Sequence, residues 1–263
     1  MKNIEELIDK LHLEDLQNES HPSIFDENEE YSMLIIRLPV ITDALQVQSI
    51  GFVLTAQNSY AYNKDKKIFE ELTGAFEGPY SIIDKFTDRV LKSFITYQDE
   101  IADMEELLYK DNFRNDFMKN WLALKVDILR IERILLRAEI TLKSFIDSFS
   151  ENPEFPINKY IDIHEHIERT MRSATLQLSK LDYLYNFYNA KSNDKMNRMI
   201  YFLTIISAIF LPLNLLVGFF GMNTSGLPFT QGSAGTYYVI SVMLLLFGAV
   251  SIVTMNWRKK VEK

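Results

Sequence analysis

Hydrophobic residues are concentrated near the C-terminus, in two apolar stretches at 199–220 and 237–256. No Asp, Glu, Lys or Arg lies anywhere from Met199 to Asn256. At 1.5 Å per helical residue each stretch spans about 30 Å, the thickness of the hydrocarbon core of a bilayer. Basic residues lie at the two outer ends, namely Lys191, Lys195, Arg198, Arg258, Lys259 and Lys260. This pattern predicts two membrane helices in the cell membrane with both termini cytoplasmic, rather than a buried hairpin of a soluble protein.

Glycine and proline are absent from 80–152 and from 157–211. Such long runs without helix breakers predict long helices. The first run is expected to hold two helices separated near 111–115, where Asp and Asn cluster. The second run continues without a breaker into the first apolar stretch, so a single stalk helix of roughly 95 Å is expected.

Residues 1–79 show a different pattern, with a helix expected at 1–16 and strands at 33–40, 46–54 and 60–62. The predicted fold class is therefore an α+β cytosolic domain with long stalk helices, followed by two C-terminal transmembrane α-helices. The expected divisions are an α/β domain (1–79), antiparallel helices (80–152), a stalk (153–198), the first membrane helix (199–220), an outer loop (221–236), the second membrane helix (237–256) and a basic tail (257–263).

A regular apolar seam runs along the predicted stalk, with steps of three and four residues that are typical of a coiled coil. Its members are Ile163, Ile167, Met171, Ala174, Leu178, Leu181, Tyr185 and Tyr188. The seam is compatible with packing against helices of the same chain. It is also compatible with packing around an axis shared by several copies.

Charge is distributed unevenly. The chain carries a net charge of −8, the tail from Trp257 carries +3 and the membrane block carries none, so residues 1–198 carry −11. An acidic surface repels nucleic acid and attracts cations. The chain has no cysteine, which excludes disulfides and thiolate metal sites. It also lacks a phosphate-binding glycine loop, a nucleophile elbow and a His-Glu-x-x-His site, so neither an enzyme nor a nucleotide partner is expected.

Two membrane helices cannot enclose a path for ions, so transport would require several copies that each contribute one helix to a central axis. Polar residues recur along the first membrane helix at roughly helical spacing: Asn197, Thr204, Ser207 and Asn214, with Leu203, Leu211 and Gly218 between them. Asn214 is expected to face protein or water rather than lipid. For Thr204 and Ser207, ordinary helix packing explains the sequence equally well.

The first apolar stretch ends with Phe220, followed by Gly221, Met222 and Asn223. A Gly-Met-Asn tripeptide after an aromatic residue, at the end of the first of two C-terminal membrane helices, resembles the CorA-type metal ion transporter family. The similarity runs without a gap from Lys195 to this tripeptide. The resemblance implies a homopentameric funnel in which the tripeptide forms the selectivity filter, with Asn223 as a ring at the outer mouth.

Further site assignments follow from the same resemblance. Positions that match the family's pore-facing residues are Asn197, Leu203, Leu211 and Asn214, and Ser207 and Gly218 fall on the same predicted face. Leu203 and Leu211 would form hydrophobic constrictions. Neutral oxygens suit Mg²⁺, which gives up its waters reluctantly, because they bind the hydrated ion without stripping it.

Asp162 matches a carboxylate that binds a regulatory divalent ion between subunits in relatives, and Glu165 lies one turn further on. An acidic start of a solvated helix explains both residues equally well. Partner carboxylates are expected from the N-terminal domain, with Asp65, Glu70 and Glu71 as candidates. The nearby His164 and His166 are expected to point to different faces and so to form a poor ligand pair.

The expected function is transport of divalent cations, most simply Mg²⁺ as both transported and regulatory ion, with Co²⁺ or Ni²⁺ as further substrates. No covalently bound cofactor is expected, and the expected partners are the bilayer, divalent cations and further copies of the chain. The outer linker carries no acidic residue, unlike that of many relatives, and its Gly-Leu-Pro run resembles the zinc-transporting branch. Proton-coupled Zn²⁺ transport is therefore the alternative, and a membrane-anchored coiled-coil scaffold without transport is a more distant one.

Overall fold

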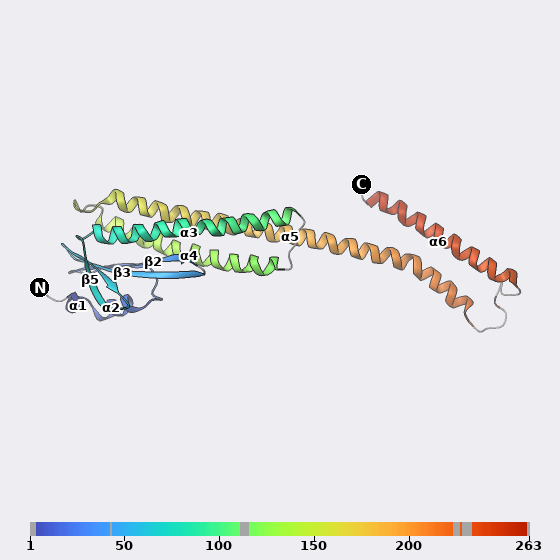
Figure 1. The fold of residues 1–263 in the computed structure, drawn as a ribbon, viewed down its shortest axis with the longest axis horizontal. Coiled ribbons are helices and arrows are strands. Elements are labelled where there is room, and N and C mark those ends of the chain that lie inside the picture. The colour runs from blue at the N-terminus through green and yellow to red at the C-terminus, as the bar shows by residue number, and fades with distance from the viewer. Residues whose placement is uncertain (1–3, 43, 111–115, 223–226, 228–232, 262–263) are drawn as a thin grey trace. The chain divides into compact units, whose positions relative to one another are not determined.

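The structure, a computed structural model, describes residues 4–42, 44–110, 116–222, 227 and 233–261. The chain forms two units, Met1–Asn186 and Phe187–Lys263. The first unit contains a sheet and the helices that pack on it, and the second contains the apolar C-terminal helices (Figure 1).

The sheet of the first unit is an antiparallel meander in the order β1-β2-β3-β4-β5. Its strands are β1 (Ile24–Glu27), β2 (Ser32–Ile41), β3 (Leu45–Leu54), β4 (Ser59–Asn63) and β5 (Ile68–Leu72). The three strands expected from the sequence are confirmed as β2, β3 and β4. The outer strands β1 and β5 were not predicted.

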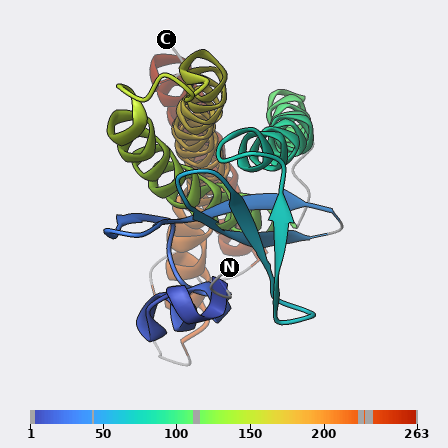
Figure 2. The same ribbon diagram turned by 90° about the vertical axis from the view of Figure 1, so that its left-hand side faces the viewer.

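Both faces of the sheet are covered, which explains why β2 is apolar along most of its length. Alternate residues of a strand point to opposite faces. Met33 and Ile35 belong to a cluster with Ile8 and Leu16 of the N-terminal segment. Leu34, Ile36 and Leu38 are buried on the other face, where α3 (Glu77–Tyr109) and α4 (Phe117–Phe149) contact this strand. Figure 2 shows the sheet between the short N-terminal helices and the long ones.

The N-terminal segment forms two short helices, α1 (Ile4–Leu7) and α2 (Lys10–Gln17). The expectation of one helix over 1–16 was therefore wrong. Asp9 interrupts it because its carboxylate caps α2, accepting a hydrogen bond from the Leu11 backbone N–H at 2.8 Å. The Asp9 backbone N–H donates to the buried Tyr31 hydroxyl at 3.0 Å, which fixes the break against the sheet.

Four long helices follow: α3 (Glu77–Tyr109), α4 (Phe117–Phe149), α5 (Ile157–Phe220) and α6 (Ser233–Val261). The first breaker-free run does hold two helices, which end and begin on either side of the expected break; residues 111–115 themselves lie outside the described part of the chain. Helix α3 starts earlier than position 80 because Gly78 and Pro79 fit its first turn. A side chain at Gly78 would approach the Leu72 Cβ to 2.5 Å.

Aromatic side chains join α3, α4 and α5 at one end of the first unit. Tyr160 is completely buried, and its ring stacks on Phe155 with the ring centroids 4.9 Å apart. Its hydroxyl donates to the Phe76 carbonyl at 2.8 Å. Phe145 contacts the same rings and also Phe25 of β1, at 5.3 Å between centroids. These contacts connect the sheet to the first turns of α5.

The seam of the stalk packs largely within the chain itself. Ile163, Ile167, Ala174 and Leu181 are completely or almost completely buried by the chain's own residues. Met171, Leu178, Tyr185 and Tyr188 are half-buried. Packing against the chain's own helices therefore accounts for the most buried members of the seam.

Candidate ion pathway and regulatory site

Helix α5 continues without interruption from the stalk to Phe220, with Pro212 inside it. Its apolar end and the segment Ala234–Val253 of α6 are both long and apolar enough to cross a membrane. The expected second span, 237–256, lies within α6. These two helices make up most of the second unit.

The membrane part of α5 has two different sides. Half-buried residues recur on one side, namely Tyr201, Ile205, Ile209, Pro212, Leu213, Leu216 and Phe220. All predicted pore-lining residues are exposed, namely Asn197, Leu203, Ser207, Leu211, Asn214 and Gly218. At 3.6 residues per turn, this second set lies on roughly the opposite side of the helix from the first. The structure thus gathers the predicted pore residues on one uncovered, uncharged face.

Individual residues on this face differ in chemistry. The side chains of Leu203 and Leu211 are 63% and 73% exposed, so neither is used in packing within the chain. The Thr204 hydroxyl donates to the Ile200 carbonyl at 2.8 Å, which leaves its oxygen lone pairs on the exposed face. A side chain added at Gly218 would meet no atom within 4 Å. The face therefore alternates neutral polar groups with bulky apolar ones.

Gly221 ends the helix for a steric reason. Its backbone N–H donates to the Val217 carbonyl at 2.8 Å. A Cβ at this position would lie 2.9 Å from the same carbonyl oxygen, closer than real Cβ contacts. Glycine is therefore required for the chain to leave the helix here, immediately before exposed Met222. Asn223, the predicted outer ring, lies outside the residues that the structure describes.

Asp162 and Glu165 are both exposed on α5. The Asp162 carboxylate lies 3.8 Å from His166 Nε2, one turn further along the helix. His164 points elsewhere, because its Nε2 lies 2.9 Å from the Glu139 carboxylate on α4. The two histidines therefore point to different neighbours, as their spacing in the sequence predicts.

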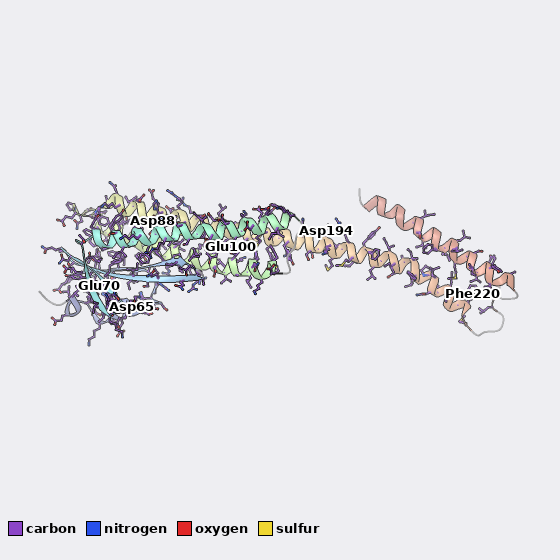
Figure 3. All side chains as sticks on the ribbon, viewed as in Figure 1. Asp65, Glu70, Asp88, Glu100, Asp194 and Phe220 are labelled. Atoms are coloured by element: carbon purple, nitrogen blue, oxygen red, sulfur yellow. The ribbon has the colours of Figure 1, made fainter. Side chains whose placement is uncertain are left out.

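The three partner candidates lie at the β4–β5 end of the sheet. Asp65 lies between β4 and β5, and Glu70 lies on β5 (Figure 3). Glu70 accepts hydrogen bonds from Lys66 at 3.1 Å and Asn63 at 2.9 Å, and these lower the pKa of its carboxyl. Asp65 and Glu71 are exposed. Since Glu70 already has local donors, Asp65 and Glu71 are the more available of the three.

Other carboxylates near Asp162 were missed from the sequence. Burial, followed by the charges of Asp84 and then Asp162, raises the pKa of the Tyr80 hydroxyl, so a carboxylate of α3 and one of α5 both act on this side chain. Glu77 lies in the same region and pairs with Lys159 at 2.6 Å. Only tertiary structure could reveal this, because Asp84 and Asp162 are far apart in the sequence.

Within the described residues, no three His, Asp or Glu side chains are grouped closely enough to hold a metal ion. A divalent ion at Asp162 would therefore need ligands from outside a single chain, or water molecules in its coordination shell.

Comparison with known proteins decides the family. A family model described as "CorA-like Mg2+ transporter protein" matches residues 2–255. The chain belongs to the CorA-like Mg²⁺ transporter family. Members of this family are membrane transporters of divalent cations rather than enzymes, so the described sheet unit is cytoplasmic and the two apolar helices cross the membrane.

Individual CorA-like relatives are distant. The zinc transport protein ZntB of Vibrio parahaemolyticus is 21% identical over 89% of this chain and 76% of its own length. The cobalt/magnesium transport protein CorA of Methanocaldococcus jannaschii is 20% identical over 84% of this chain and 74% of its own length. The solved CorA structure from the latter organism covers 95% of this chain and 84% of that one, with a TM-score of 0.77 and 17% identity. The α+β fold with two C-terminal membrane helices is therefore that of CorA.

Proposed function

We propose that the chain assembles as a homopentamer and transports hydrated Mg²⁺ along an axis lined by the membrane part of α5. The observation that carries the proposal is the uncovered, uncharged face of this helix with Ser207 and Asn214. A single such face cannot enclose a pathway, but a ring of copies can. Neutral oxygens can bind the waters of Mg²⁺ without removing them, which permits both selection and release.

A second surface supports assembly. Helix α4 carries an exposed apolar stripe with steps of three and four residues, a pattern that is typical of helix packing. Its members, with the polar Arg133 between them, are Met118, Leu122, Val126, Leu129, Leu136 and Ile140. The stripe offers neighbouring copies a surface to pack against.

Native mass measurement in detergent tests the assembly. Five copies of the 30.7 kDa chain are expected in each particle. A monomer or dimer that still transports ions would contradict a pathway on a shared axis. The membrane-anchored scaffold would be supported instead if a pentamer formed but carried no ion.

Ion identity is tested by flux into proteoliposomes. We expect Mg²⁺ uptake in the absence of a proton gradient, with Co²⁺ or Ni²⁺ as further substrates, and no covalently bound cofactor to be required. Zn²⁺ transport is the second candidate, because one relative is named a zinc transport protein. Zn²⁺ uptake that requires a proton gradient, without Mg²⁺ uptake, would replace the Mg²⁺ proposal.

Cytosolic Mg²⁺ is proposed to close the same pathway. The cytosolic part carries a net charge of −11 in each copy, so a ring brings many carboxylates together. Ions bound at Asp162 and Glu165, with Asp84 or Asp65 as partner carboxylates, would screen this repulsion and stabilise the closed state. Loss of the ions would shift the population towards a state in which the constrictions at Leu203 and Leu211 open.

A further inference from the structure

A cavity of about 540 Å³ lies between the C-terminal part of α3 and the N-terminal part of α4, beside the β2–β3 hairpin. This volume is within the range of about 300–1,000 Å³ that is typical of small-molecule sites. Its floor is apolar and includes two aromatic rings, because the buried side chains that line it are Tyr97, Met104, Leu108, Phe117 and Leu124. The ion pathway on α5 does not use any of these residues.

The rim of the cavity is acidic. Among the described residues that line it, four are carboxylates, namely Glu100, Asp103, Asp116 and Asp127, and none is Lys, Arg or His. Glu100 lies on α3 (Figure 3) and is exposed, as is Asp103. Asp127 accepts a hydrogen bond from the Tyr97 hydroxyl at 2.8 Å, which orients one carboxylate over the aromatic floor.

Two nearby lysines form ion pairs outside the cavity. Lys125 pairs with Asp182 of α5 at 2.5 Å. Lys110 pairs with Glu106, which does not line the cavity. Glu100 and Asp103 have no such basic neighbour among the described residues that line the cavity, so their negative charge is available to a cationic ligand.

The distribution of carboxylates around the cavity favours an organic cation as ligand over a bare metal ion. In the described chain no three acidic or histidine side chains converge on one point that could hold a metal. Instead the carboxylates are distributed around an apolar floor. A chain of methylene groups can cover that floor, while ammonium groups at intervals along it reach separate carboxylates and the faces of aromatic rings.

We propose that this cavity binds a linear aliphatic polyamine, with its methylene segments on Tyr97 and Phe117 and its ammonium groups on Glu100, Asp103 and Asp127. The apolar stripe of α4 lies on the other side of that helix, since Leu122 and Val126 are both about half a turn from the lining residue Leu124. Assembly through the stripe leaves the mouth of the cavity accessible. The site is therefore independent of the proposed ion pathway.

The test is calorimetric titration of the full chain in detergent with spermidine, in the presence of millimolar Mg²⁺. Saturable binding of one spermidine per chain is expected. The double variant Glu100→Gln/Asp103→Asn should bind about fivefold more weakly, because two exposed ion pairs are lost. The variant Ala123→Phe should abolish binding without changing the charge, because Ala123 lines the cavity and is exposed, so the larger ring can enter it.

Asp99→Asn is the matched control, since Asp99 is exposed beside Glu100 on α3 but does not line the cavity. Its affinity should equal that of the wild type. Circular dichroism of each variant checks that the helices are retained. The proposal is wrong if the wild type shows no saturable binding, if Ala123→Phe binds normally, or if Asp99→Asn weakens binding as much as the double variant does.

Discussion

The cytosolic part and the membrane part of α5 differ in which residues are buried and in which are charged. In its cytosolic part seven residues are buried against the chain, from Tyr160 to Leu184, and charged residues such as Asp162 and Glu165 are exposed. In its membrane part, 199–220, which the structure describes completely, no residue is fully buried and none is charged. The polar residues Ser207 and Asn214 there lie on the uncovered face.

The difference arises because water surrounds the cytosolic part of α5 and lipid surrounds its membrane part. In water, burying apolar surface stabilises the fold, so the cytosolic part is organised around a buried seam. In a bilayer, apolar side chains gain little by leaving lipid, whereas a polar side chain facing lipid is costly. Exposed polar residues in the membrane part therefore indicate a face that does not contact lipid, whereas exposed polar residues in the cytosolic part are expected on any water-facing surface. Changes at one end should alter transport, and changes at the other should alter stability or regulation.

Substitution at the outer end of α5 should have the largest effect. Asn223→Ala is expected to reduce Mg²⁺ uptake by at least about tenfold, because the proposed ring loses amide groups that bind the hydrated ion. Uptake into proteoliposomes is the measurement, with the pentamer checked by native mass. Asn193→Ala, an exposed asparagine outside the apolar stretch, should transport normally. Wild-type flux in Asn223→Ala would remove Asn223 from the selectivity filter.

The next effect concerns regulation by the cytosolic part. Asp162→Lys places a fixed positive charge where the proposed divalent ion binds, so it should blunt the protease sensitivity that appears when Mg²⁺ is removed. Limited proteolysis over a range of Mg²⁺ concentrations measures this. The same charge change at exposed Glu151 serves as the control. If Asp162→Lys is cleaved like the wild type at every concentration, Asp162 is an ordinary surface charge.

A smaller effect should appear in stability alone. Tyr160→Phe removes the hydrogen bond to the Phe76 carbonyl, which then keeps only the Tyr80 backbone N–H as a donor, at 3.1 Å. The free energy of unfolding of the cytosolic unit should fall by about 1 kcal/mol. Denaturant unfolding measures the loss, and the rate of Mg²⁺ uptake at 25 °C should stay within about twofold of the wild type. A large loss of flux would show that stability and transport are not separated along α5.

Much of this fold could be predicted from local sequence. The breaker-free runs give α3, α4 and α5, and continuous apolar stretches give β2 and β3. Strand β1 was missed because its four residues include Asp26 and Glu27 and it depends on Phe25 packing against Phe145 of α4. Strand β5 was missed because Glu70 and Glu71 make it look like a solvated loop.

Some residues of the candidate site could likewise be predicted from the local sequence, and others could not. The residues on the uncovered face of α5 could be predicted because helical spacing alone places Ser207, Leu211 and Asn214 together. The joint influence of Asp84 and Asp162 on Tyr80 could not, since it depends on how α3 packs against α5. The cavity beside Tyr97 could likewise not be predicted from the sequence, because its floor and rim come from two helices and a hairpin.

Cysteine accessibility tests the central claim most directly, because the chain has no cysteine and any introduced thiol is unique. Single variants Ser207→Cys and Leu211→Cys on the uncovered face would be compared with Ile205→Cys and Ile209→Cys on the half-buried one. A water-soluble, charged thiol reagent should react with the first pair and block Mg²⁺ uptake. It should leave uptake by the second pair unchanged. Equal block of both pairs, or block only at Ile205 and Ile209, would contradict a pathway lined by the uncovered face of α5.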